Sequence, residues 1–537
     1  MSTACGKATR VAILRQVKKF ITSLTKPISL LALLLLLVTI LRLPNFSEPY
    51  WYGDEGIYLT IGNSIRNGGK LYTDIVDHKT PVIYYLAAVN SQLQFRIVLY
   101  ISMILATSAF FVLSQSLFKK LFPTFIAGLL FVIFTSLPWF EGHVANGELF
   151  VMTFVLVGAW LLLQTSMFKK YFEQKKTTAI VLKKKDYFFL LGAGVFFGLS
   201  ALTKVPAIFD IAGFGIIFFF MLLRSGWSNF KTIFQTALTF GLGILAPIIL
   251  SIIYFALRGS GQDYLDFGLL YNFHYAGTWV PSFSSAIVAT LFTFKGKFVV
   301  MMLVLVGLFI FTRKISKPLQ FATAWFVLAL FATLLSNRPY PHYYLQTIPP
   351  LALLVGLAVS QFVNKKGKKD LLEIILPVAS LALFVGVLFA LNVGLYQTGS
   401  YYKNWLEFTQ GKMSKAEYYQ TFNYLMKDNY EAAKVIRSGS EEPNLFIWGT
   451  NPMLYALAKA VPPTRFTVSF HIADLNVYDQ TIADVVAAKP KFIVVMNDEP
   501  NQLPGLGQLL SENYIINGDF DNYILWKRIN EPQGLLY

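Results

Sequence analysis

The feature that most constrains this chain is a series of long apolar runs, for example over residues 28–41 and 371–391. A helix needs about 20 such residues to cross the hydrocarbon layer of a bilayer. Only 14% of the residues are charged, whereas a soluble domain carries about 25%. The chain is therefore predicted to be an α-helical polytopic membrane protein.

A hydropathy window of about 19 residues indicates about eleven transmembrane helices. Their predicted ranges are approximately 26–43, 95–117, 121–138, 148–166, 187–203, 206–223, 233–256, 297–312, 319–335, 343–362 and 371–392.

Positive charges are distributed unevenly between the connecting segments. The N-terminal tail and every second loop hold about 24 Lys and Arg, whereas the alternate loops hold about six. Because basic loops stay on the cytoplasmic side, the N-terminus is predicted to be cytoplasmic. With an odd number of spans, the segment after residue 392 lies on the opposite side. These clusters account for the net charge of +17 without nucleic acid, for which no aromatic-basic motif is present.

The sequence pattern changes after the last apolar run. Short apolar segments that fit strands (444–448, 491–496, 514–517, 523–527) alternate there with helical patterns near 415–437 and 473–488, which is typical of a mixed α/β domain. The predicted parts are a cytoplasmic basic tail (1–25), a transmembrane domain (26–392) and an extracytoplasmic domain (393–537).

The first outer loop, 44–94, is long and patterned. Apolar residues within 55–66 share one helical face, and Thr80-Pro81 fits the start of a second helix, with Thr80 as N-cap. Two short amphipathic helices in the membrane interface are expected.

Asp54 and Glu55 stand between glycines in this loop, about ten residues beyond the first span. Either carboxylate can cap the helix that begins there. The functional alternative is a general base at the membrane surface, which glycine neighbours would leave open to a substrate.

Two lysines are candidates for binding phosphate. Lys79 precedes the second short helix, although an interfacial Lys often only extends toward lipid headgroups. Lys204 lies between two apolar stretches, on the side where the positive-inside rule gives no reason for it. A charge at that depth is costly unless it is paired, so either an anionic phosphate or a carboxylate, Asp210 or Asp54, is expected beside it.

Three further outer-side residues, His274, Arg338 and His342, are candidates for the same phosphate site. Arginine suits phosphate geometrically, although a lone His is more often structural. Glu141, His143 and Glu148 share a short loop that could contact an acceptor or hold a metal ion, although their spacing is nonspecific.

One carboxylate with several cations on one face is what transfer from a lipid phosphate requires. The base takes the acceptor proton, and the cations stabilise the departing phosphate. Because phosphate is already a good leaving group, no cofactor is required, and a divalent metal is left open.

The order of these motifs resembles the GT-C superfamily of polyprenyl-phosphate-sugar-dependent glycosyltransferases, especially protein O-mannosyltransferases and the aminoarabinose transferases of lipid A. The motifs are Asp54-Glu55, Lys79-x-Pro81, Ala145-Asn146-x-Glu148, Leu202-Thr203-Lys204 and Arg338 followed by His342-Tyr343. They cover residues 1–365, and the C-terminal part is similar only in kind.

The resemblance implies an inverting transferase with Asp54 as base, and with Lys79, Lys204 and His274 at the carrier phosphate. His78 stands where the lipid A enzymes carry an acidic residue, which puts a metal site there in doubt. The implied partners are the bilayer, a polyprenyl-phosphate-linked sugar and an acceptor that is protein, lipid or glycan. The alternatives are a transporter (flippase) of lipid-linked sugars and a surface-polysaccharide ligase or polymerase.

Overall fold

The computed structural model describes residues 26–173, 181–277, 279–363, 370–438 and 444–529. The predicted basic tail, 1–25, lies outside the described residues.

A helix occupies each of the eleven predicted ranges. Among the described residues, seven helices, taken with their flanking turns, are long and apolar enough to cross a membrane, and α6 is a shorter apolar helix. The chain is therefore a multi-pass membrane protein. The eleven helices are α2 (Pro27–Arg42), α5 (Gln92–Phe118), α6 (Leu121–Ser136), α7 (Gly147–Gln164), α9 (Lys184–Ala201), α10 (Ile208–Ser225), α11 (Phe230–Leu257), α15 (Phe294–Ile310), α16 (Lys317–Thr333), α17 (Ile348–Val363) and α18 (Leu372–Ala390).

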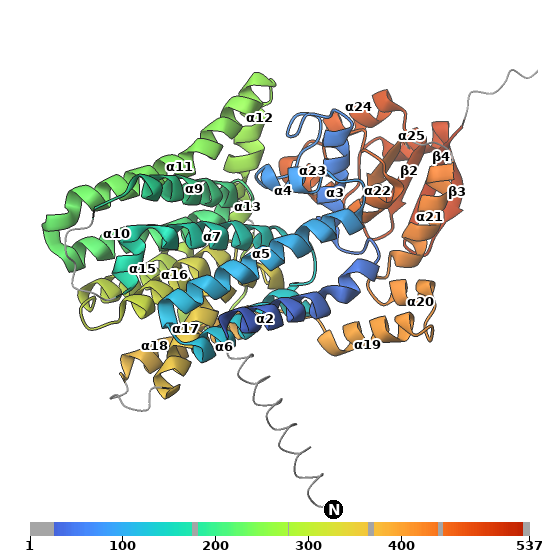
Figure 1. Cartoon of the computed structure of the whole chain (residues 1–537). Helices are drawn as coiled ribbons and strands as arrows, with labels where there is room; N and C mark the ends of the chain where they lie inside the picture. Colours follow the sequence, from blue (N-terminus) through green and yellow to red (C-terminus); the bar gives the residue numbers. More distant parts are fainter. Residues whose placement is uncertain (1–25, 174–180, 278, 364–369, 439–443, 530–537) are drawn as a thin grey trace, which may run out of the picture.

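These helices form one bundle, in which α5, α7, α9 and α11 pack successively against one another (Figure 1). On the remaining sides, α10 packs against α16, and α17 contacts both α6 and α18. The α9–α11 contact depends on small residues. A Cβ atom on Gly194 would lie 2.3 Å from the carbonyl oxygen of Phe240, and one on Gly243 would lie 2.5 Å from that of Leu191. Such close backbone approach is typical of membrane helix pairs.

The loop 44–94 contains the two expected helices, α3 (Gly53–Arg66) and the short α4 (Val82–Leu86). The expected amphipathic placement of α3 is wrong, because ten of its residues are buried. Helix α22 (Pro452–Ala458) packs directly on it, and a Cβ on Gly56 would lie 2.8 Å from the backbone nitrogen of Met453. The expected Thr80 cap is also wrong, since its hydroxyl donates to the carbonyl of Ala201 at 3.1 Å.

The C-terminal part is the predicted mixed α/β domain. Its sheet has the strand order β1-β2-β4-β3, with β1 parallel to β2 and the other pairs antiparallel. The predicted helix at 415–437 is two helices, because residues 421–425 turn between them. The elements are α19 (Thr398–Thr409), α20 (Lys415–Gln420), α21 (Met426–Ser438), β1 (Leu445–Trp448), α22, α23 (Ser469–Leu475), α24 (Tyr478–Ala488), β2 (Phe492–Met496), α25 (Leu506–Asn513), β3 (Tyr514–Asp519) and β4 (Tyr523–Arg528).

This domain packs against one end of the helical bundle through the loops (Figure 1). Val76 pairs with Phe466 in an isolated β-bridge, and Arg465 forms an ion pair with Asp263 at 2.9 Å. Asn63 donates to the carbonyl of Lys459 at 3.1 Å. The candidate site residues lie at this junction.

Candidate active site

Asp54 lies in the first turn of α3, where the helix N-terminus favours a negative charge. The Tyr58 hydroxyl, one helical turn later, donates to Asp54 Oδ2 at 3.0 Å, and Lys79 Nζ lies 3.5 Å from the same oxygen. Burial opposes ionisation, but Lys79 and His342 outweigh it and hold the pKa of Asp54 below its usual value. With 28% of its side chain exposed, Asp54 is an ionised carboxylate open to a substrate.

Asp77 is the second carboxylate beside Lys79, at 3.7 Å, and it is buried. Its Oδ2 accepts a hydrogen bond from the Tyr84 hydroxyl at 2.7 Å, and its Oδ1 lies 3.0 Å from His78 Nδ1 and 3.6 Å from His471 Nε2. Although burial raises the pKa of Asp77, Lys79 and His78 outweigh burial and keep it well below the usual value. Burial alone would lower the pKa of Lys79, but the two carboxylates raise it.

Three donor atoms of Asp77, His78 and His471 lie within 4.8 Å of one another. Asp77 and His471 are buried, and 12% of the His78 side chain is exposed. Burial lowers the pKa of His471 to about 3, so its imidazole is neutral at pH 7. A carboxylate with two imidazoles is a donor set that divalent transition metals accept. Among the described residues, these three could hold a metal ion.

Lys204 has a partner that the sequence did not indicate. Its ammonium forms a short ion pair with Glu148, at the start of α7, and lies 4.3 Å from the centre of the Tyr343 ring. Neither expected partner, Asp54 or Asp210, forms an ion pair with it. Asp210 instead accepts hydrogen bonds from Trp325 Nε1 and Gln346 Nε2, both at 2.6 Å.

Glu141 and His342 form a second short ion pair. The hydroxyl of Tyr52 donates to Glu141 at 2.7 Å and lies 3.2 Å from His342 Nδ1. His143, predicted to share a metal loop with these carboxylates, instead stacks on Trp51 at 5.8 Å, and burial lowers its pKa to about 3.

The proposed metal loop is therefore not supported by the geometry. Glu141 and Glu148 belong to different ion pairs, with His342 and Lys204, and His143 packs among aromatic rings.

Two predicted phosphate ligands lie outside the set of residues that line the cavity described below. His274 is exposed, on a short helix, α13 (Tyr271–Gly277). The guanidinium of Arg338 lies 4.4 Å from the ring centre of Tyr275 and 5.8 Å from that of Trp279. Tyr275 rather than His274 reaches the cavity, where it stacks on His78 at 4.5 Å.

Glu55 is also outside the cavity. Successive residues of a helix point about 100° apart, so Glu55 projects from the other side of α3. It accepts hydrogen bonds from Arg96 Nε at 3.0 Å, Arg96 Nη2 at 2.8 Å and Gln92 at 3.0 Å. The predicted catalytic role of Glu55 is inconsistent with this buried pairing.

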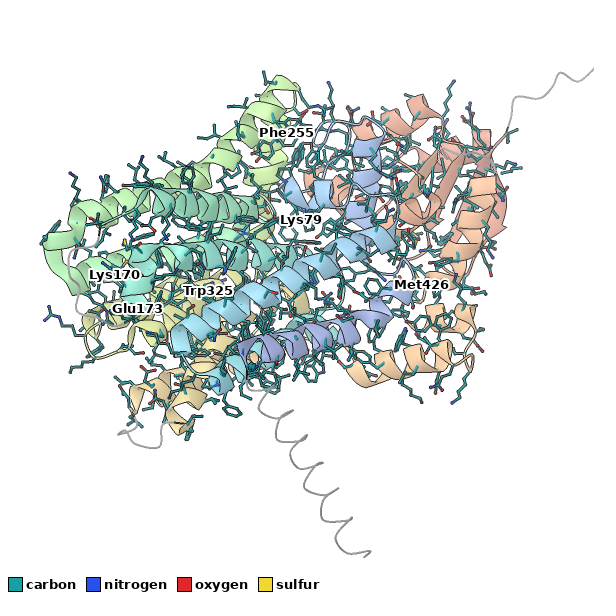
Figure 2. The ribbon with its side chains drawn as sticks, in the orientation of Figure 1. Lys79, Lys170, Glu173, Phe255, Trp325 and Met426 are labelled. Carbon is teal, nitrogen blue, oxygen red and sulfur yellow. The ribbon has the colours of Figure 1, made fainter. Side chains whose placement is uncertain are left out.

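One cavity of about 940 Å³ joins the ion pairs. Figure 2 shows Lys79 where the bundle meets the C-terminal domain, and Trp325 within the bundle. One part of the wall is apolar, and the C-terminal domain contributes another part. The lining includes polar residues (Tyr52, Asp54, Asp77, His78, Lys79, Glu141, Glu148, Lys204, His342, Tyr343), apolar residues of the bundle (Ile208, Phe209, Phe294, Phe298, Met301, Phe331, Leu335) and Thr450, Pro452 and Phe470.

Sequence reasoning missed Asp77 and His471. Asp77 had a local signal, because it directly precedes His78 and the candidate Lys79 in a charged tripeptide. His471 had none, since only the fold brings a residue of the C-terminal domain to the first loop.

Of the comparisons with known proteins, the one with solved structures bears on the fold. No protein-family model matches the chain, and no curated protein matches it. Among solved structures, the chain is similar to the crystal structure of ArnT from Cupriavidus metallidurans bound to undecaprenyl phosphate, with a TM-score of 0.55 and 14% identity. The match covers 94% of this chain and 98% of that one. It confirms the predicted fold, a helical membrane domain with a C-terminal α/β domain, and its extent includes most of the C-terminal domain.

Proposed function

We propose that this chain is an inverting membrane glycosyltransferase that moves a sugar from a polyprenyl-phosphate carrier to an acceptor hydroxyl. One observation carries the proposal: Asp54, Lys79 and Lys204 line a single cavity, part of whose wall is apolar. A polyprenyl-phosphate sugar has the matching parts, a long apolar tail and an anionic phosphate beside a sugar. The similar ArnT structure was determined with undecaprenyl phosphate bound.

In the proposed reaction, the oxygen of the acceptor hydroxyl attacks the anomeric carbon, and Asp54 accepts the proton that this hydroxyl loses. The bond between that carbon and the phosphate oxygen breaks on the opposite face, so the anomeric configuration inverts. The electron pair leaves with the polyprenyl phosphate, and Lys79 and Lys204 stabilise the charge.

Both lysines already have carboxylate partners, Asp54 and Asp77 for Lys79 and Glu148 for Lys204. We infer that the carrier phosphate shares these cations with their carboxylates. His342, held by Glu141, contributes a further donor on the same wall.

A metal is not required by this scheme, because the phosphate leaves without one. Asp77, His78 and His471 would hold a divalent cation if one binds, where it would add positive charge near Lys79. We expect transfer to persist in EDTA and the melting temperature to stay unchanged. If EDTA abolishes transfer and a divalent salt restores it, the metal has a role in the reaction.

The test is incubation of purified protein with a panel of polyprenyl-phosphate sugars, read by mass spectrometry. Release of free sugar and polyprenyl phosphate, or transfer when membrane extract is added, is expected. Asp54→Asn should abolish both while the protein remains folded, with a modestly lower melting temperature, because Lys79 loses one of its two carboxylate partners. Asp74→Asn is the matched control, since Asp74 is exposed in the same loop and lies outside the cavity lining.

Full activity of Asp54→Asn would contradict the assignment of the base. Binding across the panel with no product, with and without extract, would favour a lipid-linked-sugar transporter. Use of whole lipid-linked glycans in place of single sugars would favour a ligase or polymerase.

A further inference from the structure

The C-terminal domain forms part of the cavity wall with residues that are open to solvent. Thr450 follows strand β1, and Phe470 lies in α23; both side chains line the cavity. Thr450 is exposed, and Phe470 is 38% exposed. Phe470 packs on the His471 ring at 4.4 Å, and its place in the cavity lining makes it available for apolar contact with a ligand.

Behind Thr450 lies a chain of hydrogen bonds with a fixed direction. The Ser469 hydroxyl donates to Glu499 Oε2, and Glu499 Oε1 accepts from the Asn501 backbone nitrogen at 3.1 Å and from its side-chain amide at 3.0 Å. Since Ser469 has given its one proton to the carboxylate, its oxygen can only accept. The hydroxyl of Thr450, 3.3 Å away, must therefore be the donor.

This direction determines what Thr450 offers to the cavity. With its proton committed to Ser469, the Thr450 oxygen presents lone pairs, so it accepts hydrogen bonds from a ligand. A ligand that carries O–H groups meets this requirement, whereas a phosphate or carboxylate does not. In the described part of the C-terminal domain, no Lys or Arg lines the cavity. The series of hydrogen bonds that begins at Thr450 ends on the carboxylate of Glu499.

We propose that Thr450 and Phe470 form a subsite for a neutral sugar ring. The hydroxyls of the ring donate to Thr450 Oγ1, and its C–H face packs on Phe470. The inference deepens the proposed function, on which its catalytic part rests. The ring belongs either to the sugar being transferred or to a glycan acceptor, and the chemistry of recognition is the same.

The first experiment is binding, which needs no turnover. Methyl glycosides of common hexoses are titrated into the detergent-solubilised full chain by calorimetry, with glycerol phosphate as the anionic comparison. Thr450→Val and Phe470→Ala should each weaken binding roughly 5- to 10-fold, the value of one hydrogen bond or contact. Thr409→Val is the matched control, because Thr409 is exposed on α19, outside the cavity lining.

A second experiment identifies the source of the ring. If Thr450→Val raises the KM for the lipid-linked sugar in the hydrolysis reaction, the subsite binds the transferred sugar. Normal hydrolysis with weakened transfer to a methyl glycoside assigns it to the acceptor. Absence of glycoside binding, binding unaffected by both substitutions, or preference for glycerol phosphate would overturn the proposal. Glycoside binding without any turnover would retain the subsite and reject the proposed function.

Discussion

At the scale of single residues, the lysines of the cavity are paired with carboxylates before a ligand enters. Each lysine that could bind phosphate contacts a carboxylate, Asp54 or Asp77 for Lys79 and Glu148 for Lys204. A buried charge without a partner costs several kcal/mol, so such pairing maintains the site in the unliganded protein. The net binding free energy of an arriving phosphate is therefore its own attraction to the lysines minus the weakening of the lysine–carboxylate pairs.

Lys204→Ala tests this contribution. Loss of a charge-assisted contact should raise the KM for a polyprenyl-phosphate sugar roughly 10- to 100-fold. The melting temperature should also fall, because buried Glu148 would lose its partner. The measurement is the rate of donor hydrolysis against donor concentration. Lys295→Ala, which removes an exposed lysine outside the cavity lining, should leave the KM unchanged. An unaltered KM in Lys204→Ala would exclude Lys204 from the phosphate site.

The lowered pKa of Asp54 sets a pH dependence. A carboxyl whose pKa is lowered on folding stabilises the folded state above its ordinary value of 3.8, and this contribution is lost as the pH falls through the lowered value. The base is therefore ionised throughout the range from about pH 5 to pH 8. In this pH range, we expect no fall of kcat/KM on the acid side that is due to protonation of Asp54. A fall of kcat/KM near pH 6 that persists in His78→Gln and His342→Gln would contradict the lowered pKa of Asp54.

At the scale of elements, the position of α3 explains why the neighbouring residues Asp54 and Glu55 have different surroundings. The pattern predicted this helix and an acidic pair at its start, but it could not tell Asp54 from Glu55. That choice depends on what surrounds α3: the cavity and Lys79 on one side, and Arg96 of α5 on the other. The eleven apolar helices and the four strands were predictable from local patterns. The Glu148–Lys204 pair and His471 were not, because they depend on which elements pack together.

Glu55→Gln is the counterpart of Asp54→Asn at this scale. Arg96 is buried and would lose one charged partner while keeping Glu48, 3.3 Å away. We expect a loss of about 2 kcal/mol in the free energy of unfolding, seen as a lower melting temperature in detergent. The kcat of the folded fraction should stay near that of the wild type. A stable but inactive Glu55→Gln protein would instead place Glu55 in the reaction.

At the scale of the whole molecule, the C-terminal domain and the first loop close the cavity together. Val76 and Phe466 form a β-bridge between them, and His471 and Phe470, a few residues further, reach the site. The domain therefore completes the site that the bundle begins. Both the proposed reaction and the sugar subsite need this junction to be on the side of the membrane where the acceptor is found.

The sidedness follows from charge and can be measured with the one native cysteine, Cys5. Because about 24 Lys and Arg lie in the tail and alternate loops, these segments are expected in the cytoplasm and the junction outside it. A membrane-impermeant thiol reagent should label Cys5 in inside-out vesicles and spare it in right-side-out vesicles. In the Cys5→Ser background, Ser511→Cys, at an exposed position of α25, should show the opposite pattern. Labelling of both cysteines from the same side would mean an even number of spans, and a reversed pattern would place the proposed reaction on the cytoplasmic face.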